Sequence, residues 1–244
     1  MYKYLDHIES PEDFRSFSPD ELRDLCAEVR DYMVQCCAKS PGHLGSSLGA
    51  VELIVGYHYV FDTPRDKIVF DVGHQAYAHI ILTGRREAFR NLRAQDGPSG
   101  FPQMSESPYD AFGAGHSSVS VSAALGFAEA ARMQGGEYKV AALIGDGALT
   151  GGLAFEGLNN AGESNADILI LLNDNNQSID APRGALHRYL LQVTTSMGYN
   201  RIKKGVWNVL GEGRIRRMLQ RSVRAVKSWF VKRSGGDFFV KAGS

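Results

Sequence analysis

Three short, mostly apolar runs stand in the middle of the chain, at residues 67–71, 138–144 and 166–172. Runs of this length that are rich in Val, Ile and Leu are typical of strands buried on both faces of a parallel sheet. Helical stretches are predicted after the first run, at about 117–133, and after the second, at about 150–161. This alternation predicts an α/β fold with a parallel sheet and helices on both faces.

The first part of the chain carries the signals of helices. Ser18 and Glu21 have the spacing of a capping box, so a helix is expected to begin there and to end near residue 39, before a Pro-Gly pair. A Gly-rich loop at 42–47 is then expected to lead into a second, more apolar helix at about 48–60.

The chain ends in a basic segment of different character. Residues 201–233 hold eleven basic residues against one acidic residue, with apolar residues at roughly helical spacing. The rest of the chain has 16 basic and 26 acidic residues, although the formal net charge of the 244 residues is zero. A basic amphipathic segment can bind a membrane surface or an anionic partner; we favour a solvated face over an active site that handles phosphates. The expected organisation is a domain at 1–185 followed by a basic helical or mobile segment at 186–244.

Composition restricts the class of protein. Hydrophobic residues make up 43% of the chain and charged residues 22%, which is typical of soluble globular proteins. The balanced charge argues against a general preference for nucleic acid or membrane, and no run approaches the length of a membrane span. The N-terminus lacks the apolar core of a secretory signal. Cys26, Cys36 and Cys37 lack the spacing of a zinc site and are expected to be reduced, so a cytoplasmic protein is predicted.

Polar residues follow the second and third predicted strands. Asp146 lies between two glycines directly after the run at 138–144, and Asn175 comes 29 residues later, just past the next strand. Because ligands bind beyond the carboxyl ends of parallel strands, both side chains can converge on one ion. Oxygen ligands suit Mg²⁺, which also keeps places for phosphate oxygens and water. Gly147 allows close approach of the backbone to phosphates, and the helix expected near Thr150 offers free N–H groups.

Three histidines form a second constellation. His43, His74 and His116 are each preceded by Gly and lie in predicted loops. Imidazole suits proton transfer and hydrogen bonding to phosphate or hydroxyl groups near neutral pH. A single histidine is usually structural or merely exposed, but three in Gly-flanked loops beside a phosphate and metal motif are expected to line a pocket.

The segments that contain these residues resemble one family. Gly-Asp-Gly after a strand, with Asn at the end of the next strand, is the pattern of thiamine-diphosphate enzymes. Together the segments look like 1-deoxy-D-xylulose-5-phosphate synthases, whereas general transketolases share the metal motif but not this combination. The matching segments are 40–49, 71–77, 81–86, 99–102, 106–110, 113–118 and 144–152. The resemblance is dense from about 41 to 185, and it implies that 1–185 is a diphosphate-binding domain.

The resemblance also implies roles for individual residues. Mg²⁺ would be held by Asp146, Asn175 and the backbone carbonyl of Gln177, where family members often have Met. His43 would line the substrate side and assist proton transfer. The residues expected to contact thiamine diphosphate are His74, Gly115, His116, Ser117, Gly147, Ala148 and Asn175.

The family's reaction condenses pyruvate with glyceraldehyde 3-phosphate and releases carbon dioxide, which feeds isoprenoid and thiamine synthesis. Its members are homodimers that continue through two further domains, which carry the activating glutamate and the arginines for the acceptor's phosphate. Glu156 is instead expected to pack or to cap a helix. We therefore expect an N-terminal part of a synthase that is inactive alone. Two alternatives stay open: one half of a split transketolase-like enzyme, or a non-catalytic thiamine-diphosphate-binding module whose interaction surface is the basic stretch 214–233.

Overall fold

The computed structural model describes residues 1–113 and 115–173, and within them three strands form one parallel sheet. The strands are β1 Lys67–Phe70, β2 Val140–Gly145 and β3 Ile168–Asn173, in the order β1-β2-β3. Gly145 is in register with Asn173, so β2 and β3 end level with each other. The predicted parallel sheet is confirmed, and each strand lies within one or two residues of its expected position.

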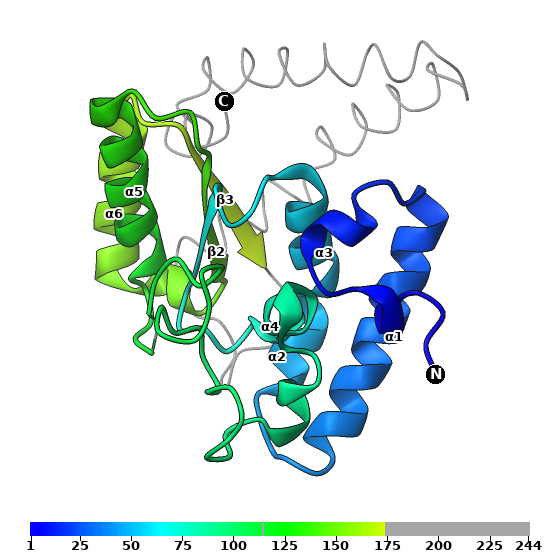
Figure 1. Cartoon of the computed structure of the whole chain (residues 1–244). Helices are drawn as coiled ribbons and strands as arrows, with labels where there is room; N and C mark the ends of the chain where they lie inside the picture. Colours follow the sequence, from blue (N-terminus) through cyan, green and yellow to red (C-terminus); the bar gives the residue numbers. More distant parts are fainter. Residues whose placement is uncertain (114, 174–244) are drawn as a thin grey trace, which may run out of the picture.

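Helices cover both faces of this sheet, as predicted. Figure 1 shows α5 and α6 on one side of the strands, and α1, α2, α3 and α4 on the other. The helices are α1 Pro19–Cys37, α2 Leu44–Gly49, α3 Val51–Val60, α4 Tyr77–Ile80, α5 Ser120–Gln134 and α6 Gly152–Glu163. Shorter helical turns cover Leu5–His7, Pro11–Phe14, Ile81–Arg85, Ala88–Asn91 and Ala148–Thr150.

Successive side chains of the strands separate into two hydrophobic cores. Ile68, Phe70 and Ala141 pack with α1 and α3, whereas Val69 and Ala142 pack with α5 and α6. This separation follows from strand geometry, since neighbouring side chains point to opposite faces of a sheet. Burial on both faces explains why the strands are almost continuous apolar runs rather than alternating ones.

Helix α1 begins with the predicted capping box. The Ser18 hydroxyl accepts a hydrogen bond from the Glu21 backbone N–H at 3.4 Å, and the Glu21 carboxylate accepts one from the Ser18 backbone N–H at 2.8 Å. These two bonds satisfy backbone donors that have no partner within the helix. The helix ends at Cys37, two residues before the predicted end.

The expected loop at 42–47 and single helix at 48–60 are wrong in detail. Helix α2 already begins at Leu44, and a break at Ala50 separates it from α3. Ala50 is fully buried, with φ −98° and ψ −2°, outside the ideal helical values. Two glycines within α2 lower its intrinsic helix propensity, and contacts with α1 and α3 override that preference.

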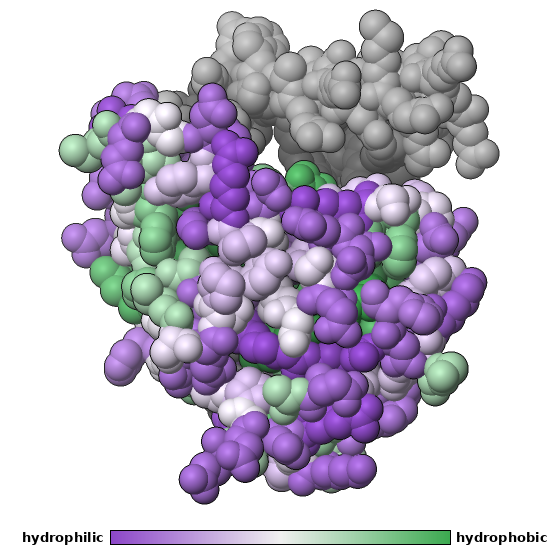
Figure 2. Space-filling model, viewed as in Figure 1, coloured by the Kyte–Doolittle hydropathy of each residue, from purple (hydrophilic) through white to green (hydrophobic). Residues whose placement is uncertain are grey.

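The three cysteines are free and buried, as expected. Burial raises the pKa of Cys26 to about 11, so this thiol is protonated and unreactive. Among the described helices, none combines the length and apolar character that a membrane crossing needs. Figure 2 shows a largely hydrophilic face, with hydrophobic residues grouped mainly on the side that α5 and α6 form. The predicted boundary at 185 and the basic segment 186–244 lie outside the described residues and stay predictions.

Candidate functional site

The loop before α5 is fixed between the end of β1 and the turn after β2. Asp71, directly after β1, is 2% exposed, and its carboxylate accepts hydrogen bonds from the backbone N–H groups of Ser118 (2.8 Å) and Ser120 (3.0 Å). The Ser118 hydroxyl then donates to the Ala148 carbonyl at 2.7 Å. Ser118 has a φ of +69°, a conformation that these bonds impose on a residue with a side chain. The predicted segment 115–117 therefore adjoins the predicted residues Gly147 and Ala148.

The turn after β1 crosses the ends of the other two strands. Gln75 is buried, and its side-chain oxygen accepts a hydrogen bond from the Asn173 amide at 3.2 Å. A Cβ atom on Gly145 would lie 2.9 Å from the Gln75 amide nitrogen, so glycine permits this close crossing. Val72 (φ +59°) and Gly73 (φ +95°) turn the chain into this path. This turn brings His74 to the same edge of the sheet as Asp146.

Hydrogen bonds join helix α2 to that turn, and His43 is the residue directly before this helix. The Ser47 hydroxyl donates to the His74 carbonyl at 2.8 Å, and the His43 backbone N–H donates to the Tyr77 hydroxyl oxygen at 2.9 Å. The rings of His43 and His74 lie edge to face with centroids 5.8 Å apart. On its other side, the His43 ring stacks against Phe101 at 5.8 Å and an interplanar angle of 20°.

Both histidine rings are neutral near pH 7. Burial lowers the pKa of His74, and the neighbouring His43 lowers it further, against the opposing effect of Asp71. The pKa of His43 is lowered by partial burial and by the charge of Arg93. A neutral imidazole can donate at one nitrogen and accept at the other. Nδ1 of His74 is buried and has no hydrogen-bond partner in the described part of the chain.

Asp146 has the property expected of a metal ligand. One of its carboxylate oxygens, Oδ2, is buried and has no hydrogen-bond partner within residues 1–113 and 115–173. A buried carboxylate oxygen without a partner is unfavourable, and a divalent cation would supply the missing interaction. Gly147 beside it is exposed, and the Thr150 hydroxyl donates to the Gly147 carbonyl at 2.7 Å, which shapes the turn into α6. These residues fit Mg²⁺ and a phosphate group.

The described residues contain one of the three predicted metal ligands. Over that part of the chain, no three His, Cys, Asp or Glu side chains converge on a common point. Asn175 and Gln177 lie outside the described residues, and their assignment as ligands stays a prediction.

The structure brings most of the other predicted site residues to one edge of the sheet. His43, His74 and Ala148 border it through the contacts given above, and Asp146 lies there directly after β2. Gly115, His116 and Ser117 are exposed in the loop that Ser118 ties to this edge. The sequence reasoning gave no role to Asp71, Gln75, Tyr77, Phe101 or Ser118, which shape this site. Their place within the family-like segments was an available signal, but their contacts depend on the tertiary fold.

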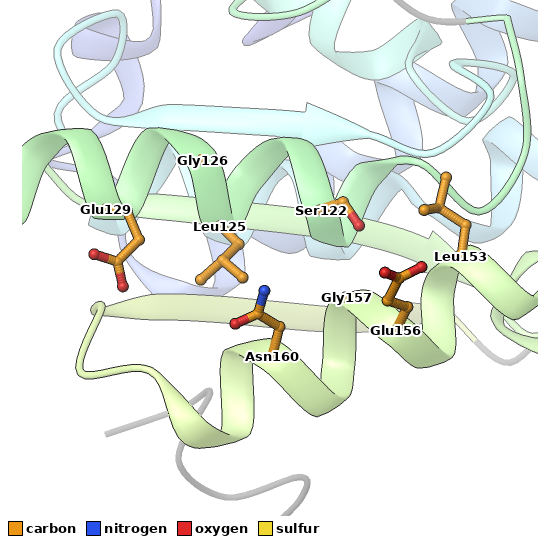
Figure 3. Close-up of a pocket in the computed structure, with 8 residues that line it drawn as sticks. All are labelled: Ser122, Leu125, Gly126, Glu129, Leu153, Glu156, Gly157 and Asn160. Atoms are coloured by element: carbon orange, nitrogen blue, oxygen red, sulfur yellow. The ribbon is translucent and has the colours of Figure 1, made fainter.

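A groove of about 420 Å³ lies between α5 and α6 and shares no residue with the predicted site (Figure 3). Glu156 was expected to pack or to cap; instead it is exposed and faces this groove from the second turn of α6. No side-chain hydrogen bond caps the N-terminus of α6. The residues lining the groove are Ser122, Leu125, Gly126, Glu129, Leu153, Glu156, Gly157 and Asn160.

Comparison with known proteins decides the family. The family model described as 1-deoxy-D-xylulose-5-phosphate synthase matches residues 5–243. The chain belongs to this family. The synthase of Porphyromonas gingivalis is 55% identical over 206 residues, which cover 84% of this chain and 32% of that protein. The synthase of Phocaeicola vulgatus is 49% identical over 239 residues, covering 95% of this chain and 38% of that protein.

The 1-deoxy-D-xylulose-5-phosphate synthase family is thus the one that the sequence motifs resemble. The chain spans about a third of the length of the curated relatives it matches. Its match to the family model includes the sheet edge with His43, His74 and Asp146 and the basic stretch 201–233. The family assignment confirms the expected membership of the 1-deoxy-D-xylulose-5-phosphate synthase family.

Proposed function

We propose that this chain binds the diphosphate of thiamine diphosphate together with Mg²⁺, as the N-terminal part of a 1-deoxy-D-xylulose-5-phosphate synthase. The observation that carries the proposal is the buried oxygen of Asp146, without a partner among the described residues, at the carboxyl edge of the parallel sheet. In sheets of this kind, ligands bind at that edge. The parent enzyme would condense pyruvate with glyceraldehyde 3-phosphate and release carbon dioxide.

The residues at the sheet edge would divide the binding between them. Asp146 would hold Mg²⁺ together with Asn175 and the backbone carbonyl of Gln177. Exposed Gly147 and the segment 115–117 would offer backbone groups to the diphosphate, because backbone N–H groups in loops and at helix N-termini bind anions. When bound, the cofactor supplies an electron sink for decarboxylation; the protein positions it.

The two neutral histidines would serve different sides of this site. His74 presents a buried Nδ1 that has no partner among the described residues, and it can bond to the bound cofactor. His43 has an exposed ring between His74 and Phe101, and it can hold or release a proton near the substrate. A neutral ring suits both roles because protonation would remove the accepting nitrogen.

The wider setting is proposed from the family. The full-length protein would be a cytoplasmic homodimer with a diphosphate-binding domain at residues 1–185. Because the relatives are about three times as long, we expect the 244-residue chain to bind the cofactor without catalysing the complete reaction. A measurable release of carbon dioxide from pyruvate and glyceraldehyde 3-phosphate by the purified chain would overturn that expectation.

Isothermal titration of the purified chain with thiamine diphosphate, with and without Mg²⁺, tests the binding. We expect binding that needs Mg²⁺ and that weakens by at least about tenfold in the Asp146→Asn variant, since loss of even a supporting residue costs that much in metal sites. Asp167→Asn is the matched control, because exposed Asp167 precedes β3 at the opposite end of the sheet and pairs with Lys139. Equal binding by the Asp146→Asn variant and the unchanged chain would refute the site.

A further inference from the structure

A buried chain of polar side chains runs beside the candidate site. His58 on α3 and His79 on α4 are both 0% exposed, and their rings are joined from Nε2 of His58 to Nδ1 of His79 at 2.9 Å. The other nitrogens bond outward: His58 Nδ1 to the Thr63 hydroxyl at 2.9 Å, and His79 Nε2 to Asp110 Oδ1 at 2.9 Å. Arg85 closes the chain by donating to both Asp110 oxygens at 2.7 Å.

The chemistry of these groups fixes one direction of hydrogen bonding. The Arg85 guanidinium and the His79 ring hold the pKa of Asp110 below its usual range against the effect of burial, so its carboxylate is ionised and can only accept. His79 must therefore carry its proton on Nε2. Burial keeps both histidines neutral, so His79 Nδ1 accepts from His58 Nε2–H, and His58 Nδ1 accepts from the Thr63 hydroxyl.

This series of hydrogen-bonded side chains is connected to His43 along two routes. On one route, His79 belongs to α4, whose first residue, Tyr77, accepts the backbone N–H of His43. On the other, Oδ2 of Asp110 accepts the backbone N–H of Gln103 at 2.9 Å, and this segment carries Phe101, which stacks on the His43 ring. The hydrogen bond between His79 and Asp110 therefore ties together the two elements that contact His43.

We propose that His79 and Asp110 are positioning residues for His43: their hydrogen bond holds α4 against the segment 101–110 and so keeps Phe101 on the His43 ring. The functional meaning rests on the proposed role of His43 on the substrate side. The positioning itself needs no cofactor. It can be tested on the chain alone, so failure of this inference is distinguishable from failure of the proposed function.

Replacing Asp110 with Asn disrupts the arrangement at the residue that accepts the most hydrogen bonds in it. The carboxylate accepts four hydrogen bonds, from His79, from the Gln103 backbone and two from Arg85. An amide has one accepting oxygen and two donor hydrogens, so it cannot satisfy these four donors. Buried donors left without a partner favour rearrangement of the segment that carries them. We therefore expect Phe101 to leave the His43 ring.

Nuclear magnetic resonance of the ¹⁵N-histidine-labelled chain, without ligand, tests the proposal. In the unchanged chain, His58 and His79 are expected to be neutral with protons on Nε2, and the His43 ring protons are expected to be shifted by the Phe101 ring. The Phe101→Leu variant identifies that shift. In Asp110→Asn, the His43 signals should move to the positions seen in Phe101→Leu. The pKa of His43 should rise because its ring becomes more exposed to solvent. Within the described residues, the charged or titratable groups near His43 are His74, Arg93 and Tyr77.

The matched control is Leu158→Ala, which opens a space in the other hydrophobic core, on α6, and leaves the histidine chain intact. It is expected to lower stability without moving the His43 signals or the His43 pKa. If Asp110→Asn does not fold, His79→Leu removes the hydrogen bond to Asp110 while the bonds of Asp110 to Arg85 and Gln103 stay possible, and it should give the same shift. His43 signals that stay unchanged in a folded variant of either position, or that move equally in Leu158→Ala, would overturn the proposal.

Discussion

Acidification should lower the stability of this protein, mainly through its two fully buried histidines, His58 and His79. Burial lowers the pKa of His58 well below the ordinary value of 6.5, and the neighbouring His79 lowers it further. The pKa of His79 is also lowered by burial, although Asp110 opposes the effect. In the unfolded chain, both rings are exposed and take up protons near pH 6.5. Below that pH, the unfolded state therefore binds protons that the folded state does not.

The sign and the size of the effect follow from this difference. A depressed pKa contributes stability that is present above pH 6.5 and is lost as the pH falls below it. Below pH 6.5, each histidine that stays neutral in the folded state lowers the free energy of unfolding by about 1.4 kcal/mol per pH unit. Between pH 7.5 and 5.5, the pair should lower the free energy of unfolding by up to about 3 kcal/mol, a large share of the 5–15 kcal/mol typical of a domain. Carboxylates contribute little in this range, because they titrate nearer pH 4.

Urea denaturation of the full chain at pH 7.5, 6.5 and 5.5 measures this loss. In the His58→Gln variant, the amide can still donate to His79, and one titrating group is gone, so the loss between pH 7.5 and 5.5 should shrink by up to about 1.4 kcal/mol. His43 and His74, whose pKa values are also lowered, keep contributing to the rest. A free energy of unfolding that is unchanged between pH 7.5 and 5.5 would refute the reasoning. A pH dependence that His58→Gln leaves unaltered would assign the loss to other groups.

Three further substitutions test the local structure. Gly42→Ala would place a Cβ atom 2.3 Å from the Tyr77 hydroxyl oxygen. We therefore expect a lower melting temperature and a free energy of unfolding that is lower by about 1–3 kcal/mol. The control, Gly45→Ala, has no atom within 4 Å of its Cβ and should be neutral or slightly stabilising. Ser18→Ala removes the side-chain cap of α1 and should cost about 1 kcal/mol in urea denaturation. Equal melting temperatures for the two glycine variants, or an unchanged free energy of unfolding for Ser18→Ala, would contradict these assignments.

The sequence was informative where local chemistry decides the structure. The capping box of Ser18 and Glu21 depends on residues three positions apart, and the strands depend on burial of both sheet faces. Asp146 was recognisable because it directly follows a predicted strand, and parallel strands carry their sites at that end. The early start of α2 was not predictable in this way, because its glycines disfavour a helix that neighbouring α1 and α3 stabilise.

The histidine chain shows where reasoning from local pattern ends. His43, His74 and His116 attracted notice because each follows a glycine in a loop, whereas His58 and His79 are surrounded by apolar residues with no turn signal. The bonded partners lie 21 and 31 residues apart, in different elements, so no spacing rule joins them. A buried polar group is tolerated only when its partners are in place, and those partners are set by the packing of α3, α4 and the segment 101–110. The residues at the sheet edge can therefore be predicted from the sequence, but those that hold His43 in position follow only from the folded structure.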